Sequence, residues 1–319
     1  MRRREWAAAL VIGASLALAP CTVAARENTL QQLRDSDLRV ATVGYRLLTR
    51  NHAACPKRGS ATGLVLHSLR QYGSAVREDA LREWKFPSPV SVEDIVPGSP
   101  AQVAGLRPGD GIEAVNDRRF APWNEEKTYA TSQRDQLEQY LAGLDNTSLI
   151  TIYINRDGKS ITSDLKPSPA CSSRIEVVAG EAIKARSDGK TIQIGQAFAQ
   201  LLDDAELAFA LAHELAHTIR GHRETLASLE SAGTRAAKRQ RQSLARQFED
   251  EADLLALHLL QNAGWDPGAA PRFMRTKGRE FDLLLPGGTH RRASERAKRL
   301  EAAIARMPRN LAAPVPADF

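Results

Sequence analysis

The chain has few aromatic residues, few cysteines and no internal repeat. Aromatic side chains make up 5% of its 319 residues and cysteine occurs three times, whereas 42% of the residues are hydrophobic and 26% are charged. This balance of apolar and charged residues excludes a disordered or fibrous chain. Two domains are favoured over one at this length, because single cores usually stop growing at roughly 250–300 residues.

Long hydrophobic runs are also scarce. The only one, Trp6 to Pro20, follows three arginines and is shorter than the roughly 20 residues that a membrane-spanning helix needs. It is typical of a signal peptide, and the small residues Val23 and Ala25 predict cleavage that removes residues 1–25. We therefore expect an exported, periplasmic protein. In the alternative interpretation Cys21 is lipidated, which would associate the protein with a membrane.

The formal net charge is only +6. One group of basic residues could form a nucleic-acid or anionic-lipid patch, but such a group is more often a solvated helix face. We expect the solvated face and no nucleic-acid partner, because an exported protein rarely meets nucleic acid. The group consists of Arg235, Lys238, Arg239, Arg241 and Arg246.

Two cysteines, Cys55 and Cys171, remain after removal of the signal peptide. In an oxidising compartment we expect them to form a disulfide, the alternative being two buried free thiols. They bracket a stretch that looks like a complete inserted domain, whose two ends should lie close together.

The bracketed stretch, residues 60–167, is divided by glycine and proline into short strands and helices. Its run from Ser99 to Asn116 contains the pattern SPA…AGL.PGD.I..VN and strongly resembles the PDZ domains of HtrA-like bacterial proteases. The resemblance implies a partly open β-barrel with a groove helix at 132–144 and closing strands at 149–155 and 160–165.

In such a domain a peptide C-terminus adds as a strand beside the first strand. The alternative is a domain that keeps the fold and packs against its own protease. The resemblance implies that the groove contains Gly63, Leu64, Val65, Leu66, Leu137 and Leu141.

A helix is predicted after Asp203 and Glu206, which have the spacing of a capping box, because 207–219 lacks glycine and proline. It carries His213 and His217, four residues apart. That spacing places both imidazoles on one helical face, where two nitrogens can bind one Zn²⁺.

A catalytic zinc normally has three protein ligands. Glu249 is the best third candidate, on a second predicted helix that continues through Leu260. Glu249 and Asp253 are four apart and share a face of that helix, while Glu251 points elsewhere.

The sequences at 213–217 and 249–267 resemble those of the HtpX-like and BepA-like zinc metallopeptidases. This gluzincin group has HExxH, a downstream ExxxD and an EAD…AG.DP continuation. Over about residues 171–305 the resemblance implies zinc held by His213, His217 and Glu249, with Asp253 fixing a histidine. His290 lies where the family has a histidine near the metal, but Arg291 replaces the usual proline. His290 is therefore either near the zinc and substrate or at the surface.

The other histidines, His52, His67, His222 and His258, lack a partner at a matching spacing and are expected to be structural or exposed. The family also has an edge strand, which corresponds here to 188–194. A substrate would lie extended along Thr191 to Ile194.

The expected fold is α+β, a helix-rich zincin-type metallopeptidase domain made of residues 26–59 and 168–310 with the PDZ domain inserted and a tail at 311–319. A helix from Leu38 to Thr49 should pack against the catalytic half.

The expected function is an exported zinc endopeptidase, with one zinc per chain, that cleaves unfolded or misassembled envelope proteins. Glu214 would act as its general base. In the alternative, the protein is a non-proteolytic chaperone or adaptor whose zinc is structural or is silenced by His290.

Overall fold

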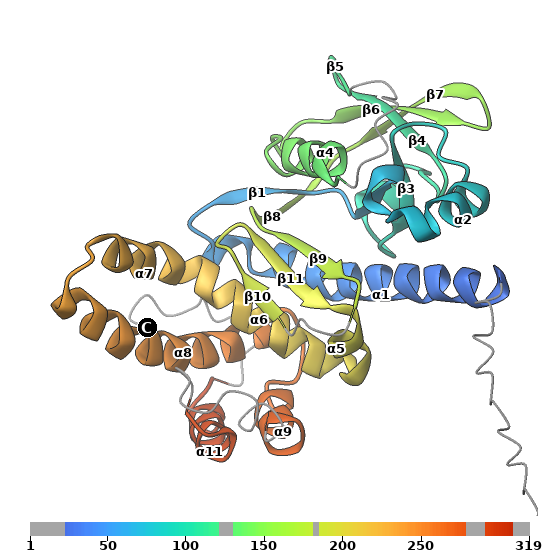
Figure 1. The fold of residues 1–319 in the computed structure, drawn as a ribbon. Helices are drawn as coiled ribbons and strands as arrows, with labels where there is room; N and C mark the ends of the chain where they lie inside the picture. Colours follow the sequence, from blue (N-terminus) through green and yellow to red (C-terminus); the bar gives the residue numbers. More distant parts are fainter. Residues whose placement is uncertain (1–22, 121–129, 181–184, 279–290, 309–319) are drawn as a thin grey trace, which may run out of the picture.

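The computed structural model describes residues 23–120, 130–180, 185–278 and 291–308. It combines helices and sheets in two parts, a helical half and a smaller β-rich domain that lies above helix α1 (Figure 1). The predicted signal peptide, including Cys21, lies almost wholly outside the described residues. Among the described residues, none of the helices combines the length and the apolar character that crossing a membrane requires.

The helical half is built around three helices whose apolar faces form one core: α1 (Val23–Arg50), α6 (Asp204–Arg220) and α8 (Arg235–Asn262). The helix expected at Leu38–Thr49 is present but belongs to the longer α1, and its Val40, Val43, Leu47 and Leu48 are buried in that core. The shorter elements around it are η1 (His52–Ala54), α5 (Gln196–Leu201), α7 (His222–Ser231), α9 (Ala269–Thr276) and α11 (Ala293–Ile304).

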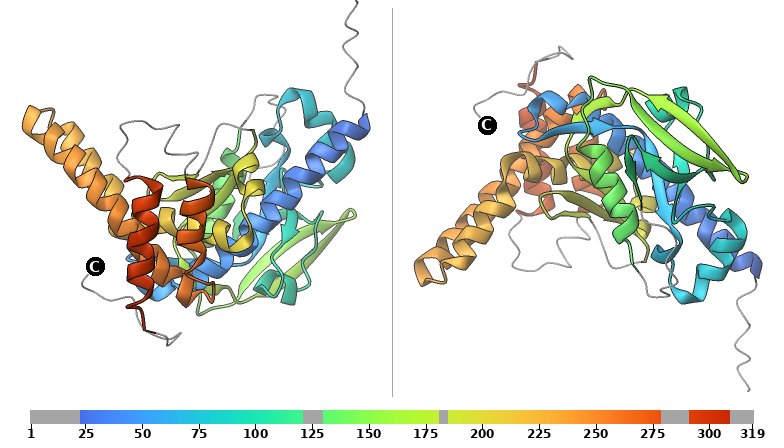
Figure 2. Two further views of the ribbon diagram at one scale, coloured as in Figure 1. Left: turned by 90° about the horizontal axis from the view of Figure 1, so that it is seen from below. Right: turned by 90° about the horizontal axis from the view of Figure 1, so that it is seen from above.

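Helix α7 and the first half of α8 form a hairpin that extends away from the body (Figure 2). The basic group at 235–246 lies on this part of α8, and all five of its members are exposed. This exposure agrees with a solvated helix face, and the absence of a nucleic-acid partner stays a prediction.

A three-stranded sheet covers one side of α6, in the order β10 (Ala185–Ser187), β11 (Thr191–Gly195) and β9 (Arg174–Val178). The predicted edge strand, 188–194, is wrong, because β11 is the central strand. Gly189, at φ +87°, turns the chain so that β10 folds back antiparallel on β11, while β9 pairs in parallel on the other side. A substrate therefore cannot pair along Thr191 to Ile194.

The β-rich domain contains a sheet in the order β2-β3-β4-β6-β7, with β5 beside β4. Its own core is buried between this sheet and helix α4. The strands and helices lie close to their predicted positions. They are β2 (Leu64–Ser68), η2 (Leu69–Gln71), α2 (Ser74–Trp84), β3 (Val90–Ile95), α3 (Pro100–Val103), β4 (Gly111–Val115), β5 (Arg118–Arg119), α4 (Ser132–Ala142), β6 (Ile150–Arg156) and β7 (Lys159–Leu165).

The two ends of this domain run side by side where they join the helical half. Strand β1 (Arg58–Ala61) pairs antiparallel with β8 (Ser168–Cys171). Cys55 and Cys171 form a disulfide with their Cα atoms 5.4 Å apart. The insertion thus begins and ends at one point, as the two cysteines predicted.

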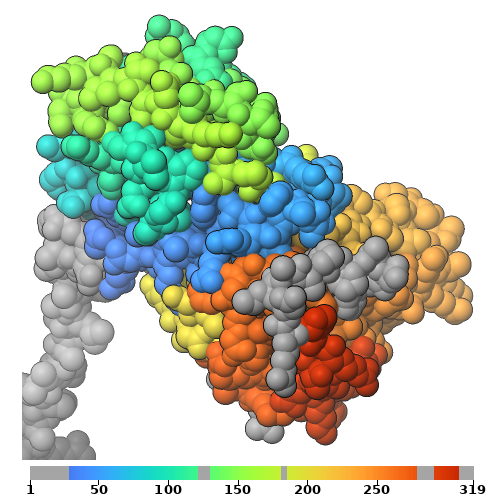
Figure 3. Space-filling view, turned by 180° about the vertical axis from the view of Figure 1, so that it is seen from behind, coloured from blue at the N-terminus to red at the C-terminus, as the bar shows by residue number. Residues whose placement is uncertain are grey.

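Ion pairs also fasten the inserted domain to the helical half, which it covers along α1 (Figure 3). Arg134 of α4 lies 2.7 Å from Glu176 of β9, and Arg174 of β9 lies 2.8 Å from Asp135 of α4. Helix α4 is therefore held against the edge of the three-stranded sheet.

Candidate functional site

Helix α6 positions the two histidines of the HExxH sequence. The Asp203 carboxylate accepts a hydrogen bond from the backbone N–H of Glu206 at 2.8 Å, and the Glu206 carboxylate accepts one from the backbone N–H of Asp203 at 3.0 Å. This is the predicted capping box. The helix ends at Gly221, which adopts the left-handed conformation that suits glycine. His213 and His217 thus lie one turn apart on a helix with both ends defined.

The structure brings His213, His217 and Glu249 together. One ligand atom from each residue lies within 4.8 Å of the other two. The two Nε2 atoms are 3.1 Å apart, and Glu249 Oε2 lies 3.2 Å from His213 Nε2. Two imidazole nitrogens and a carboxylate oxygen are a donor set that zinc accepts, with room left for a further ligand. The predicted ligand residues therefore converge in a geometry that fits a metal ion.

Asp253 contacts His213 on the side away from Glu249, as the family resemblance implied. Asp253 Oδ1 is 3.1 Å from His213 Nδ1, and the Arg296 guanidinium donates to both Asp253 oxygens at 2.7 and 2.6 Å. Burial alone would raise the pKa of Asp253, but Arg296 and, after it, His213 together outweigh burial and hold that pKa at about 2. An ionised Asp253 keeps the proton of His213 on Nδ1 and leaves Nε2 free to bind a cation.

The charges around His213 favour a positive group. Burial alone would lower the pKa of His213, but hydrogen bonds to Asp253 and Glu249, together with their charges, raise it to about 10. A cation bound at Nε2 would meet the same carboxylates, so the cluster is suited electrostatically to a metal.

Sequence reasoning missed His222, which was expected to be structural or exposed. It is buried, its Nδ1 lies 2.9 Å from His217 Nδ1, and its Nε2 lies 3.2 Å from Glu251 Oε2. His222 follows the left-handed Gly221, so helical periodicity gave no signal for this contact. The one available signal was Gly221 itself, a C-cap residue after which the chain changes direction.

The remaining catalytic candidates are Glu214 and His290. Glu214 lies half-buried on α6 beside His213, and it is not one of the three residues whose ligand atoms converge. His290 lies outside the described residues, so its predicted role is not tested.

The predicted peptide groove lies against the helical half. A cavity of about 140 Å³ is lined by Gly63, Leu64, Leu66 and Leu141, and also by Tyr45 of α1 and Ile175 of β9. Val65 and Leu137 do not line this cavity, and Leu137 is fully buried in the core of the domain. The structure therefore brings four of the six predicted groove residues together, in a space partly closed by α1 and β9.

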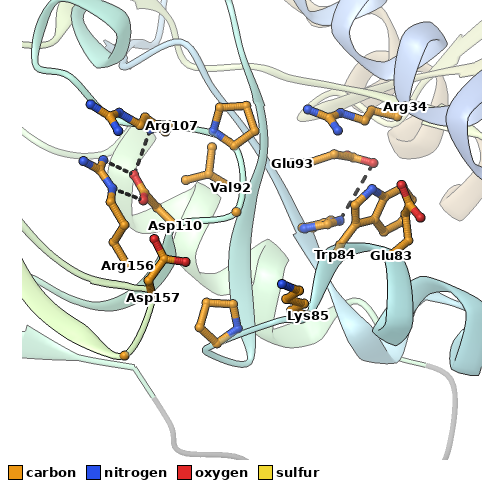
Figure 4. A pocket seen from close by; sticks show the side chains of 15 residues that line it. Arg34, Glu83, Trp84, Lys85, Val92, Glu93, Arg107, Asp110, Arg156 and Asp157 are labelled. Atoms are coloured by element: carbon orange, nitrogen blue, oxygen red, sulfur yellow. Dashed lines mark hydrogen bonds and ion pairs between the residues drawn. The ribbon is translucent and has the colours of Figure 1, made fainter.

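A second cavity, of about 530 Å³, lies on another side of the inserted domain, between α2, β3 and the loops before β4 and β7 (Figure 4). Charged side chains of both signs line it, among them Arg34, Lys85, Glu93 and Arg107. Arg156 and Asp110, which also line it, form an ion pair. His213, His217 and Glu249 do not line this cavity.

The comparisons with known proteins concern the inserted domain. A family model described as PDZ domain matches residues 91–150. Among solved structures, the HtrA3 PDZ domain bound to a phage-derived ligand (FGRWV) is similar, at 16% identity and a TM-score of 0.26, over 35% of this chain and 89% of that chain. No significant match is found among the curated proteins. The family match over 91–150, in the middle of the β2–β7 unit, shows that the chain contains a PDZ domain.

Proposed function

We propose that the protein is a zinc-dependent endopeptidase of the HtpX-like and BepA-like type that cleaves unfolded or misassembled polypeptides after export. The observation that carries the proposal is the convergence of His213, His217 and Glu249 from two helices within 4.8 Å, with Glu214 next to the first of them. A purely structural metal site has no use for a base at position 214.

The residues of the cluster would have distinct tasks. Zinc, when bound, supplies a Lewis acid that activates water near neutral pH and polarises a carbonyl group. Glu214 takes the proton of the attacking water and later delivers it to the leaving amine. Asp253 and Arg296 keep His213 in the orientation and tautomer that ligation needs.

The substrate would pair with β10. Within the described part of the chain β10 pairs with β11 alone, so its outer edge can accept a further strand. Ser187 of β10 is 2.9 Å from Thr218 of α6, one residue beyond His217. A backbone-paired substrate would therefore lie beside the cluster, and backbone pairing demands no particular sequence, which suits unfolded chains.

The PDZ domain would recognise peptides or regulate access to the protease. Because α1 and β9 help to close the groove at Leu64 and Leu66, a peptide C-terminus would enter fully only when the PDZ domain moves away from the helical half. This arrangement favours a regulatory role, in which peptide binding and the docked position compete.

The test is degradation of casein, an unfolded substrate, by the mature chain with and without a chelator. Glu214→Gln should retain zinc by metal analysis and lose about 10²–10⁴-fold in turnover, because it removes the base and spares the ligands. Glu224→Gln, at an exposed position on α7, is the matched control and should stay active.

Retained turnover in Glu214→Gln would overturn the mechanism. A parent chain that binds zinc and peptide C-termini but never cleaves casein would instead establish the peptide-holding adaptor.

A further inference from the structure

The two histidines of the cluster are supported differently. His213 has the Asp253 carboxylate at its Nδ1, in the arrangement common for metal-binding histidines. His217 has a second imidazole there, because its Nδ1 lies 2.9 Å from Nδ1 of His222. The nearby carboxylate contacts His222 instead of His217, because His222 Nε2 lies 3.2 Å from Glu251 Oε2.

The atom of His217 that would bind the metal determines where the protons lie along this series of contacts. His217 Nε2 faces His213 Nε2 and Glu249, so it must carry a free lone pair to bind a metal. The proton of neutral His217 is then on Nδ1, which donates to Nδ1 of His222. His222 accepts there and carries its own proton on Nε2, which donates to the Glu251 carboxylate. Each hydrogen bond fixes the tautomer of the next ring.

His222 is held firmly enough to act in this way. Its side chain is 3% exposed, and its ring stacks on Phe248 of α8 with a centroid distance of 4.0 Å and an interplanar angle of 1°. It is the first residue of α7, directly after the turn at Gly221. The end of α6, the start of α7 and the middle of α8 together determine where its Nδ1 points.

We propose that His222, supported by Glu251, is a positioning residue that holds His217 in the tautomer and orientation required to bind zinc. The assignment rests on the proposed zinc site. His222 is not itself a ligand, because it contacts the Nδ1 side of His217, and the ligand atoms that converge belong to His213, His217 and Glu249. Partners of this kind typically contribute 10–100-fold to metal affinity.

The experiment measures zinc affinity by competition with a chromophoric chelator, using the mature chain. His222→Phe keeps an aromatic ring on Phe248 but removes the acceptor, so zinc should bind about 10–100-fold more weakly. His222→Asn places an amide oxygen near the position of Nδ1 and should restore part of the affinity. Glu251→Gln keeps an acceptor for His222 and should cost only a few-fold.

The matched control is His67→Phe, which changes a buried histidine of the PDZ domain outside the cluster. It should leave the zinc affinity unchanged, and thermal unfolding should show every variant to be folded. Unchanged affinity in folded His222→Phe would overturn the assignment, as would a His222→Asn variant no better than His222→Phe.

The proposed function fails separately. If the parent chain binds zinc but does not cleave casein, the proposed protease activity is wrong. The zinc affinities of the variants then still decide whether His222 is a positioning residue. A parent chain that binds no zinc overturns both.

Discussion

His213 and His67 are both buried and both lie near acidic side chains, yet their environments have opposite effects. At His213 the carboxylates of Asp253 and Glu249 lie within 3.2 Å of the ring nitrogens and raise the pKa to about 10. At His67 burial lowers the pKa to about 3, and Nε2 has no hydrogen-bond partner within the described residues. His67 instead lies among aromatic rings, with Phe86 at 4.3 Å and Trp84 at 5.2 Å.

The difference arises from the charged groups that act on each ring. Glu93 lies 3.9 Å from His67, but burial of the ring lowers the pKa of His67, and the positive charges of Arg34 and Arg134 lower it further. Asp253 stays ionised because Arg296 pairs with it. The ring of His213 is thus suited to a cation because charged carboxylates lie against both of its nitrogens.

The largest expected effect comes from removing the disulfide that joins the PDZ domain, which contains His67, to the helical half, which contains His213. The Cys55–Cys171 disulfide spans a sequence separation of 116 at the junction of the PDZ domain and the helical half. Replacing both cysteines by serine should lower the free energy of unfolding by about 2–5 kcal/mol. Urea titration measures it, and the parent chain under reducing conditions is the control, which should match the variant. An oxidised parent no more stable than the variant would contradict the prediction.

A second change removes a carboxylate from the cluster and makes it more like the surroundings of His67. Glu249→Gln should weaken zinc binding by about 100-fold or more, because the charged carboxylate that faces both histidines is lost. Glu251 contacts His222 and Gln247 but neither of the converging histidines, so Glu251→Gln should cost a few-fold. Chelator competition compares the two variants, and equal affinities would refute the assignment of Glu249 as the ligand.

A third difference between the two regions is the pH dependence of stability at His67. Its folded-state pKa of about 3 lies below the unfolded value near 6.5, so the unfolded chain binds the proton more readily. The stability that His67 contributes is present above pH 6.5 and is lost as the pH falls towards 3, by at most about 1.4 kcal/mol per pH unit. Glu93, whose pKa is raised, gives a slope of the opposite sign.

The contribution of His67 is therefore measured as the difference in stability between the parent chain and a variant that lacks this histidine. His67→Phe should lose less stability than the parent between pH 6.5 and pH 4 in urea titrations. His52→Phe, at a half-buried histidine, should follow the parent. Identical curves for the parent and His67→Phe would show that His67 is not held neutral by burial.

Much of the architecture could be predicted from local patterns. The capping box at Asp203 and the four-residue spacing of His213 and His217 depend only on the geometry of one helix, and both are observed. The first PDZ strands follow from their turn residues and the closing strands from the PDZ resemblance, and the family match at 91–150 agrees with the pattern that carried that resemblance. Glu249 and Asp253 could be paired as well, because they lie four apart on one helix.

Other features depend on contacts that no local pattern contains. The edge-strand prediction for 188–194 was wrong because it required knowing that β10 folds back over β11. The groove at Leu64 and Leu66 was predicted from the PDZ domain alone, whereas its partial closure comes from α1 and β9 in the other half.

The sequence by itself determined the elements whose residues are neighbours along the chain: the spacing of His213 and His217 on α6, the turns of the PDZ domain and the two cysteines at its ends. Only the tertiary structure decided which element faces which, and so placed His222 behind His217 and Glu251 behind His222. The physical reason is that a regular helix repeats its faces with a fixed period. That period does not continue through the left-handed turn at Gly221. It also does not predict how α8 packs against α6 and α7.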